Sequence, residues 1–170
     1  MIVVASVHHT GTNFVWQNLL NGMTQVGMDH ARYVNGSIPE HGFTRIHCDL
    51  AQSPYLKFWL ERCHCIVPLR HPLLGATSWR ARDKSLETLA GQWQILKNKV
   101  DPYQPMYLPL DSPDRMNWLH TISRNIGQEL QTDWPVVMSC NKNAELSEND
   151  RAAVIEVMAD GFFDRFGYEV

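Results

Sequence analysis

The first residues of the chain place a short apolar run directly before a glycine turn and the start of a helix. Ile2–Val7 is rich in β-branched residues and predicts a buried strand. A small polar turn around Gly11 follows, and the helical pattern begins near Phe14. A strand that leads through such a turn into a helix N-terminus gathers main-chain N–H groups at the positive end of the helix dipole, an arrangement that binds phosphate. The alternative is a helix start capped by Thr10 or Thr12, without a ligand.

This turn differs from the loop of nucleoside triphosphatases, which ends in Gly-Lys followed by Ser or Thr. Gly11 is followed by Thr12 and Asn13, and the first lysine of the chain is Lys57. Without the loop lysine, the turn is poorly equipped for ATP or GTP hydrolysis. It retains main-chain donors and the side chains of Thr10, Thr12 and Asn13 for a terminal 5′-phosphate.

Length and net charge limit the classes of protein to which the chain can belong. The chain has 170 residues, which suits one domain over residues 1–170. Its net charge of −3 and its pI near 6.2 argue against a general nucleic-acid binder. No apolar run reaches the length of a membrane span, and no basic region of a signal peptide precedes the first strand. We therefore expect a cytoplasmic protein with neither a nucleic-acid nor a membrane partner.

The cysteines are consistent with this expectation. Cys63 and Cys65 stand too close together in a strand for an easy disulfide, so a reduced chain is the simpler interpretation. Together with His64 and His71 they suggest a metal site, but the second matched pair of ligands that zinc sites need is missing. We expect two core cysteines and no metal.

Short apolar runs alternate with helical patterns along the chain. The strand candidates are Ile2–Val7, Phe43–His47, His64–Leu69, Met106–Leu110 and Pro135–Met138. The helical candidates are Thr12–Met23, Tyr55–Arg62, Leu73–Arg82, Asp114–Gln131 (with Ser112 as its cap) and Arg151–Asp160 (with a capping box from Ser147); Lys84–Tyr103 is expected as part helix and part linker, and Gly22–Phe43 as a surface loop. This alternation predicts an α/β fold with three layers, in which helices cover both faces of a central parallel sheet of about five strands.

Ligands of such sheets bind at the carboxyl ends of the strands. The residues that follow the predicted strands there are His8–Asn13, His47–Asp49, Arg70 and Asp111. The planar fork of Arg70 can hold a phosphate with two bonds, and the hydroxyl of Ser78, two turns into the next helix, can add a third. The alternatives are a capping or ion-paired Arg70 and an ordinary helix position for Ser78.

In these segments the chain resembles the sulfotransferase family, whose members transfer sulfuryl groups from 3′-phosphoadenosine 5′-phosphosulfate (PAPS). The first strand with Thr10-Gly11-Thr12-Asn13-Phe14 is similar to the family's 5′-phosphosulfate loop, although His9 stands where a basic residue is usual. Arg70 followed by Ser78 is similar to the 3′-phosphate motif. Thr44-Arg-Ile-His47 resembles the strand that ends in the catalytic histidine, and Tyr107-Leu-Pro-Leu-Asp111 resembles a later strand with an acidic end. The chain is short for the family, and Lys142 is the only candidate for its late phosphate clamp.

The resemblance implies a P-loop-like α/β fold and a PAPS-dependent transferase that needs no metal and releases adenosine 3′,5′-bisphosphate. The acceptor is a hydroxyl or amine of a small molecule or glycan, and the oligomeric state stays open. The implied catalytic residues are His47 as the base, Asp49 as a reserve base or an orienter of His47, and His9 at the bridging oxygen; His8 is the alternative to His9. The implied cofactor contacts are His9, Thr10, Gly11, Thr12, Asn13, Phe14, Arg70 and Ser78.

Two other functions remain open at this point. One is a kinase-like nucleotide enzyme with an altered loop, which the missing lysine disfavours. The other is a catalytically degenerate sulfotransferase-like domain that only binds.

Overall fold

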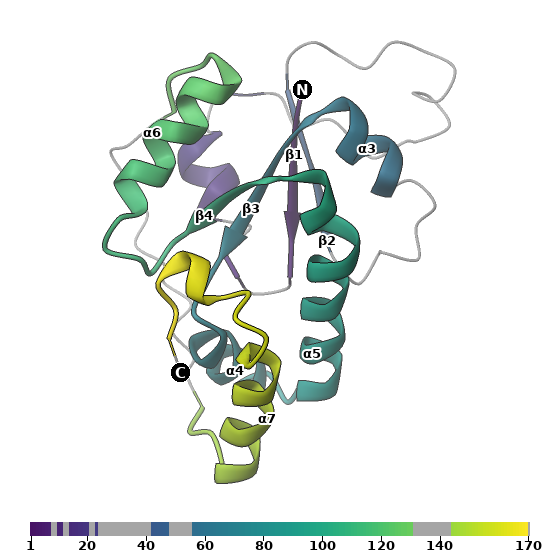
Figure 1. Cartoon of the computed structure of the whole chain (residues 1–170), viewed down its shortest axis with the longest axis vertical. Helices are drawn as coiled ribbons and strands as arrows, with labels where there is room; N and C mark the ends of the chain where they lie inside the picture. The colour runs from purple at the N-terminus through teal and green to yellow at the C-terminus, as the bar shows by residue number, and fades with distance from the viewer. Residues whose placement is uncertain are drawn as a thin grey trace.

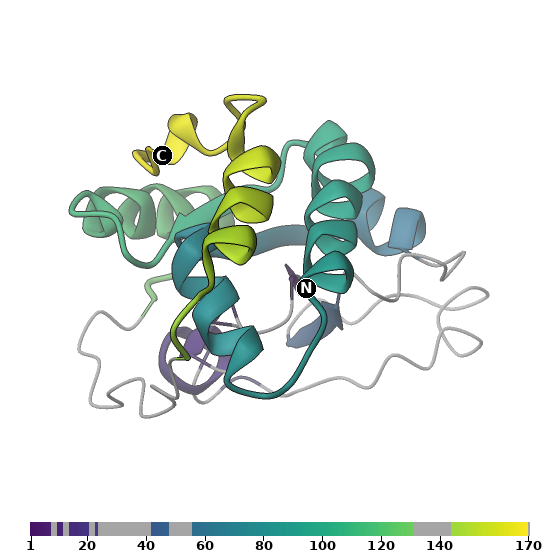
Figure 2. The ribbon, with the colours of Figure 1, turned by 90° about the horizontal axis from the view of Figure 1, so that it is seen from below.

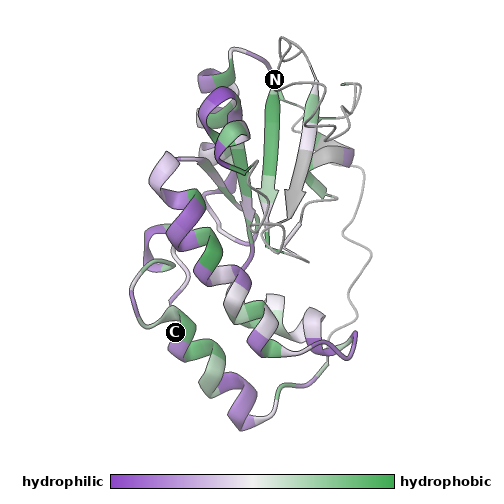
Figure 3. Ribbon diagram, turned by 90° about the vertical axis from the view of Figure 1, so that its right-hand side faces the viewer, coloured by the Kyte–Doolittle hydropathy of each residue, from purple (hydrophilic) through white to green (hydrophobic). Residues whose placement is uncertain are grey.

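The apolar run at the start of the chain forms β1 (Ile2–Ser6), and all of its residues are buried. A strand that is buried on both faces requires neighbours on each side and cover above and below. The computed structural model, which describes residues 1–7, 10–11, 14–20, 23, 42–47, 56–130 and 144–169, provides both (Figure 1). Figure 3 shows the hydrophobic character of β1 beside the amino terminus.

The strands of the described residues form one parallel sheet. Besides β1 it contains β2 (Phe43–His47), β3 (His64–Leu69) and β4 (Met106–Pro109), in the order β2-β1-β3-β4. Val3 of β1 pairs with Thr44 of β2 on one side and with Cys65 of β3 on the other. The α/β class and four of the predicted strands are therefore confirmed. The predicted strand Pro135–Met138 lies outside the described residues.

Alternate side chains of β1 enter two separate cores, as the period of a strand requires. Val3 and Ala5 belong to a cluster with residues of α3 (Leu56–Arg62), α4 (Pro72–Arg80), α5 (Leu86–Ile95) and α7 (Glu148–Met158). Ile2 and Val4 belong to a cluster with residues of η1 (Val15–Leu19) and α6 (Arg115–Ile126). Figure 2 shows α5 and η1 on opposite sides of the sheet. Helical segments thus cover both faces.

Two helix starts illustrate what capping motifs predict. Ser147 caps α7 as expected, because its hydroxyl accepts a hydrogen bond from the N–H of Asp150 at 3.1 Å. Its helix begins three residues earlier than predicted, at Glu148. The predicted cap at Ser112 is wrong: its hydroxyl accepts from the N–H of Asp114 in the preceding turn, and α6 begins only at Arg115.

The segment predicted as part linker is helical instead. After α5 the chain continues as η3 (Leu96–Val100) and η4 (Asp101–Tyr103). Leu96 and Val100 are fully buried, so apolar packing continues beyond α5. The described part of the predicted helix 12–23 is mainly the five-residue π-helix η1.

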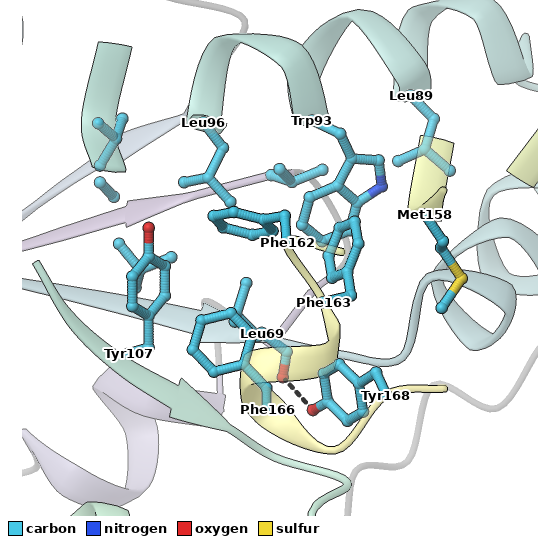
Figure 4. Packing of buried hydrophobic residues seen from close by; sticks show 14 of the residues in the cluster. Leu69, Leu89, Trp93, Leu96, Tyr107, Met158, Phe162, Phe163, Phe166 and Tyr168 are labelled. Carbon is cyan, nitrogen blue, oxygen red and sulfur yellow. Dashed lines mark hydrogen bonds between the residues drawn. The ribbon is translucent and has the colours of Figure 1, made fainter. Parts of the chain in front are cut away.

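The end of the chain closes the larger core. Aromatic residues after α7, including those of η5 (Asp164–Phe166), pack against Trp93 of α5 and Tyr107 of β4 (Figure 4). Lys97 fastens this segment, because its ammonium group donates to the carbonyl of Val157 at 2.6 Å and to the carboxylate of Asp160 at 2.8 Å. The carboxyl-terminal segment is therefore a structural part of the domain. No helix within the described ranges is long and apolar enough to cross a membrane.

Replacement of Gly11 by alanine is expected to destabilise the protein, whereas the same change at Gly91 is expected to stabilise it. Gly11 has a φ of +104°, and a Cβ there clashes with Cδ1 of Leu110. Strain and overpacking of this kind cost about 1–3 kcal/mol of the free energy of unfolding. Gly91 lies inside α5, and among the described residues no atom beyond its own helix backbone and chain neighbours lies within 4 Å of a new Cβ, so alanine there adds about 0.5–1 kcal/mol.

Urea denaturation of the two variants measures this difference. Equal changes in the free energy of unfolding for Gly11→Ala and Gly91→Ala would contradict the geometry of the turn.

Candidate functional site

The parallel strands end at one edge of the sheet, and the segments that follow them meet there. The turn with Gly11 follows β1, and His47 ends β2. Arg70 follows β3 directly, and Asp111 lies two residues beyond β4. Because β1 lies between β2 and β3, the structure brings these positions, predicted from separate segments, to the same edge.

The turn after β1 is held by hydrogen bonds among its own residues. The hydroxyl of Thr10 donates to the carbonyl of Val7 at 2.7 Å, and the N–H of Thr10 points to the same oxygen at 3.4 Å. Thr10 is completely buried. Its hydroxyl hydrogen is thus committed to the turn, and the side chain shapes the loop. Next in the turn, the carbonyl of Gly11 accepts from the N–H of Val15 at 3.0 Å.

Gly11 packs against the ends of two other strands. A Cβ added at Gly11 clashes with Cδ1 of Leu110 and lies 3.9 Å from Cβ of Pro68. Leu110 directly precedes Asp111, and Pro68 precedes Arg70 by two residues. The glycine turn is therefore a neighbour of the segments that carry the basic and acidic residues of this edge.

Arg70 is the central charged group. Its side chain is only 11 % exposed, and its Nε lies 3.7 Å from Oδ1 of Asp111. This distance defines an ion pair, but it is too long for a hydrogen bond. Nε is buried and has no hydrogen-bond acceptor within the described part of the chain. A buried donor without an acceptor is unfavourable, so the site favours an oxyanion that reaches it.

His71 is a member of the site that the sequence did not single out as such. Its main-chain N–H donates to Oδ2 of Asp111 at 2.9 Å. Its ring caps α4, because Nδ1 accepts from the main-chain N–H of Leu73 at 3.2 Å. The other ring nitrogen, Nε2, lies 3.3 Å from the carbonyl of Glu169. Because Nδ1 accepts from Leu73, Nε2 is the ring nitrogen that can donate, and it faces the carbonyl of Glu169. The only signal in the sequence was the position before Pro72, where helices often begin.

Tyr168 brings the carboxyl-terminal segment to the same edge. Its hydroxyl donates to the carbonyl of Leu69 at 3.4 Å, as the dashed line in Figure 4 shows. Its ring centre lies 5.4 Å from that of His71. Burial and, second, the carboxylate of Asp111 raise the pKa of Tyr168 above its ordinary value. No feature of the sequence predicted this contact.

Ser78 has a partner that the sequence did not reveal. It is buried in α4, and its Oγ accepts a hydrogen bond from Nη1 of Arg82 at 2.8 Å. The same Nη1 donates to the carbonyl of Ser78 at 2.6 Å. The hydroxyl oxygen of Ser78 therefore accepts from Arg82, and its hydrogen is available to be donated to another group.

Several predicted site residues lie wholly or partly outside the residues that the structure describes. Phe14 is described, and its side chain packs in the core with Val15 and Leu20, so a ligand contact there comes from its main chain. The strand position of His47 is described, but its side chain is not. Outside the described residues altogether are His8, His9, Thr12, Asn13, Asp49 and Lys142.

Other features of the molecule do not add to this edge. Within residues 56–130, 144–169 and the shorter described stretches, no group of three or more His, Cys, Asp or Glu residues is arranged to hold a metal. Cys65 is buried in β3, and burial raises the pKa of Cys63. A cavity of about 650 Å³ lies between α5 and α7, and none of the predicted site residues lines it. Comparison with family models, curated proteins and solved structures finds no match to this chain.

The titration of Tyr168 is expected to report the charge of Asp111. Tyr168 stays protonated well above pH 10, and Asp111→Asn lowers its pKa, because the carboxylate contributes to the shift. The unfolded chain loses this proton first, so the contribution of Tyr168 to stability is complete below the unfolded-state pKa of about 10 and declines as the pH rises further.

Carbon-13 NMR of ring-labelled tyrosine follows this titration, with Tyr168→Phe to assign the signal. A midpoint near the ordinary value that Asp111→Asn leaves unchanged would place Tyr168 away from the carboxylate.

Proposed function

We propose that this protein is a PAPS-dependent sulfotransferase with a P-loop-like fold, which transfers a sulfuryl group to an acceptor hydroxyl or amine. The observation that carries the proposal is Arg70, a buried guanidinium at the carboxyl end of β3 whose Nε has no hydrogen-bond acceptor within the described residues. Its strand is the immediate neighbour of β1, which leads into the glycine turn.

The donor nucleotide fits this arrangement because it carries two anionic ends. Main-chain N–H groups of the turn around Gly11 bind the 5′-phosphosulfate, in a turn whose backbone Thr10 holds in place. Arg70 and the hydroxyl of Ser78 bind the 3′-phosphate, with Arg82 orienting that hydroxyl. Recognition of the 3′-phosphate distinguishes this donor from ATP, and protein cations replace the metal that ATP chemistry uses.

The transfer step requires a base and stabilisation of the leaving group. The acceptor oxygen or nitrogen forms a bond to sulfur while the bond from sulfur to the 5′-phosphate oxygen breaks. His47, at the end of β2 next to β1, takes the acceptor proton, with Asp49 as its orienter or reserve. His9 and the N–H groups of the turn stabilise the negative charge that develops on the bridging oxygen.

Nucleotide binding tests the proposal directly. Adenosine 3′,5′-bisphosphate is expected to bind without metal, and much more tightly than 5′-AMP or ATP. Arg70→Ala is expected to weaken its binding by more than about 1.5 kcal/mol, because a charged hydrogen bond is lost. The matched control is Arg124→Ala, which removes an exposed arginine from the last turn of α6 and leaves the affinity unchanged. Isothermal calorimetry measures all of these affinities.

The results of this titration separate the alternatives. Magnesium-dependent binding of ATP in preference to the bisphosphate indicates a kinase-like enzyme. Absence of binding by every nucleotide contradicts the proposed function. An unchanged affinity of Arg70→Ala contradicts the assignment of the 3′-phosphate contact.

His47→Ala is expected to leave bisphosphate binding intact and to slow transfer at least about a hundredfold, the lower range for loss of a general base. The assay follows the release of adenosine 3′,5′-bisphosphate from PAPS by chromatography, with a panel of simple phenols, alcohols and amines as acceptors. Unchanged turnover by His47→Ala assigns the base to another residue, and Asp49→Asn is then the next variant to measure.

A further inference from the structure

The carboxylate of Asp111 lies against two donors at the end of β3. Its Oδ2 accepts a hydrogen bond from the main-chain N–H of His71 at 2.9 Å, and its Oδ1 lies 3.7 Å from Nε of Arg70. We call these two donors, Nε of Arg70 and the N–H of His71, the anion cradle. The group that contacts the anion cradle in this structure is therefore a side chain of the protein itself.

This side chain satisfies the anion cradle only in part. One carboxylate oxygen forms a hydrogen bond to His71, whereas the other is too far from Nε of Arg70 to form one. Nε is nevertheless buried, with no other acceptor among the described residues. The side chain of Asp111 is 26 % exposed, against 11 % for Arg70, so the carboxylate is the more accessible partner. An anion with better-placed oxygens can form the hydrogen bond to Nε that Asp111 does not form. It can also displace the Asp111 carboxylate, because that side chain is partly exposed.

We infer that Asp111 is a displaceable internal anion: it neutralises Arg70 while the site is empty, and the 3′-phosphate takes its place at the anion cradle. This inference rests on the proposed function. A carboxylate and a phosphate beside the same guanidinium repel each other, so Asp111 weakens the binding of the donor and of the bisphosphate product. It thereby speeds release of the product, a step that limits turnover in many enzymes.

A second role for Asp111 predicts a change of the opposite sign. If the carboxylate serves only to hold Arg70 in its binding position, its removal disorders the guanidinium and weakens nucleotide binding. If the carboxylate competes with the ligand, its removal strengthens binding. The direction of the change in affinity therefore distinguishes a competitor from a structural support.

The experiment compares wild-type protein, Asp111→Asn and Asp114→Asn with adenosine 3′,5′-bisphosphate as the probe. Asp111→Asn is expected to bind about tenfold more tightly, the scale on which an adjacent charge shifts an equilibrium. Stopped-flow displacement is expected to show correspondingly slower release. Asp114→Asn makes the same change in net charge three residues away, at the exposed N-cap residue of α6, whose carboxylate forms no capping hydrogen bond, and is expected to change the affinity less than about twofold.

A double variant tests whether the effect passes through Arg70. In an Arg70→Ala background, Asp111→Asn is expected to give a smaller gain, because competition for the guanidinium is lost and only the repulsion between the carboxylate and the phosphate remains. An equal gain with and without Arg70 identifies a general change in charge and overturns the inference.

Asp111→Asn leaves a buried guanidinium without its anion, which lowers the melting temperature of the ligand-free protein. Carbon-13 NMR of the aspartate carboxyl groups in the wild-type protein provides a measurement that does not depend on this variant. Addition of the bisphosphate is expected to move the Asp111 signal toward that of a solvent-exposed aspartate such as Asp114. Bisphosphate binding that leaves the Asp111 signal in place overturns the inference.

The outcomes separate this inference from the proposed function. Binding by wild-type protein, with equal or weaker binding by Asp111→Asn, overturns the inference alone. Absence of bisphosphate binding by both proteins overturns the proposed function and the inference together. Binding by Asp111→Asn that exceeds binding by the wild type, with the expected dependence on Arg70, supports both.

Discussion

The parallel pairing of β1 with β2 on one side and β3 on the other is the constraint on which the candidate site depends. Because neighbouring parallel strands end at the same edge, the residues after each of them become neighbours, whatever their distance along the chain. Burial on both faces holds β1 in this position, because its alternate side chains pack in two different hydrophobic cores. The site is therefore a consequence of how the sheet is packed.

Charge decides what this edge can bind. Arg70 is too deeply buried to remain without an anion, and the structure provides Asp111 at a distance that neutralises its charge, whereas Nε has no hydrogen-bond acceptor among the residues that the structure describes. The main-chain N–H of His71 also donates to this carboxylate, so a second donor beside Arg70 is directed toward an oxyanion. A phosphate meets both requirements better than a carboxylate, because it offers more oxygens and more negative charge. The proposed function and the inference about Asp111 are two consequences of this one partly satisfied guanidinium.

Elements with a clear pattern were predictable from the sequence, and elements set by their surroundings were not. The bounds of β2 and β3 agree with the predicted strands. In β3 every residue after His64 is buried, and a strand in the interior of a parallel sheet is mainly apolar, so its pattern is easily recognised. The linker expected before β4 is helical, because Leu96 and Val100 contribute to a core assembled mainly from other segments. At the site, the place of Arg70 directly after β3 was predictable because the strand has a clear pattern, and its ion pair with Asp111 is one of the alternatives that the sequence left open. Lys97 shows the opposite case. Lysine side chains are usually exposed, but the side chain of Lys97 is 8 % exposed and donates a hydrogen bond to the carbonyl of Val157 near the end of α7.

The sequence by itself determined the strand–turn–helix start, the alternation of strands with helices and the positions of charged residues after the strands, because these depend on local pattern and period. Only the tertiary structure decided which of those residues share an environment. His71 meets Glu169 across 98 positions, and Tyr168 reaches Leu69 across 99. The pairing of Asp111 with Arg70 likewise joins two strand ends. Contacts of this kind arise when separate segments pack on one sheet, and no local pattern encodes them.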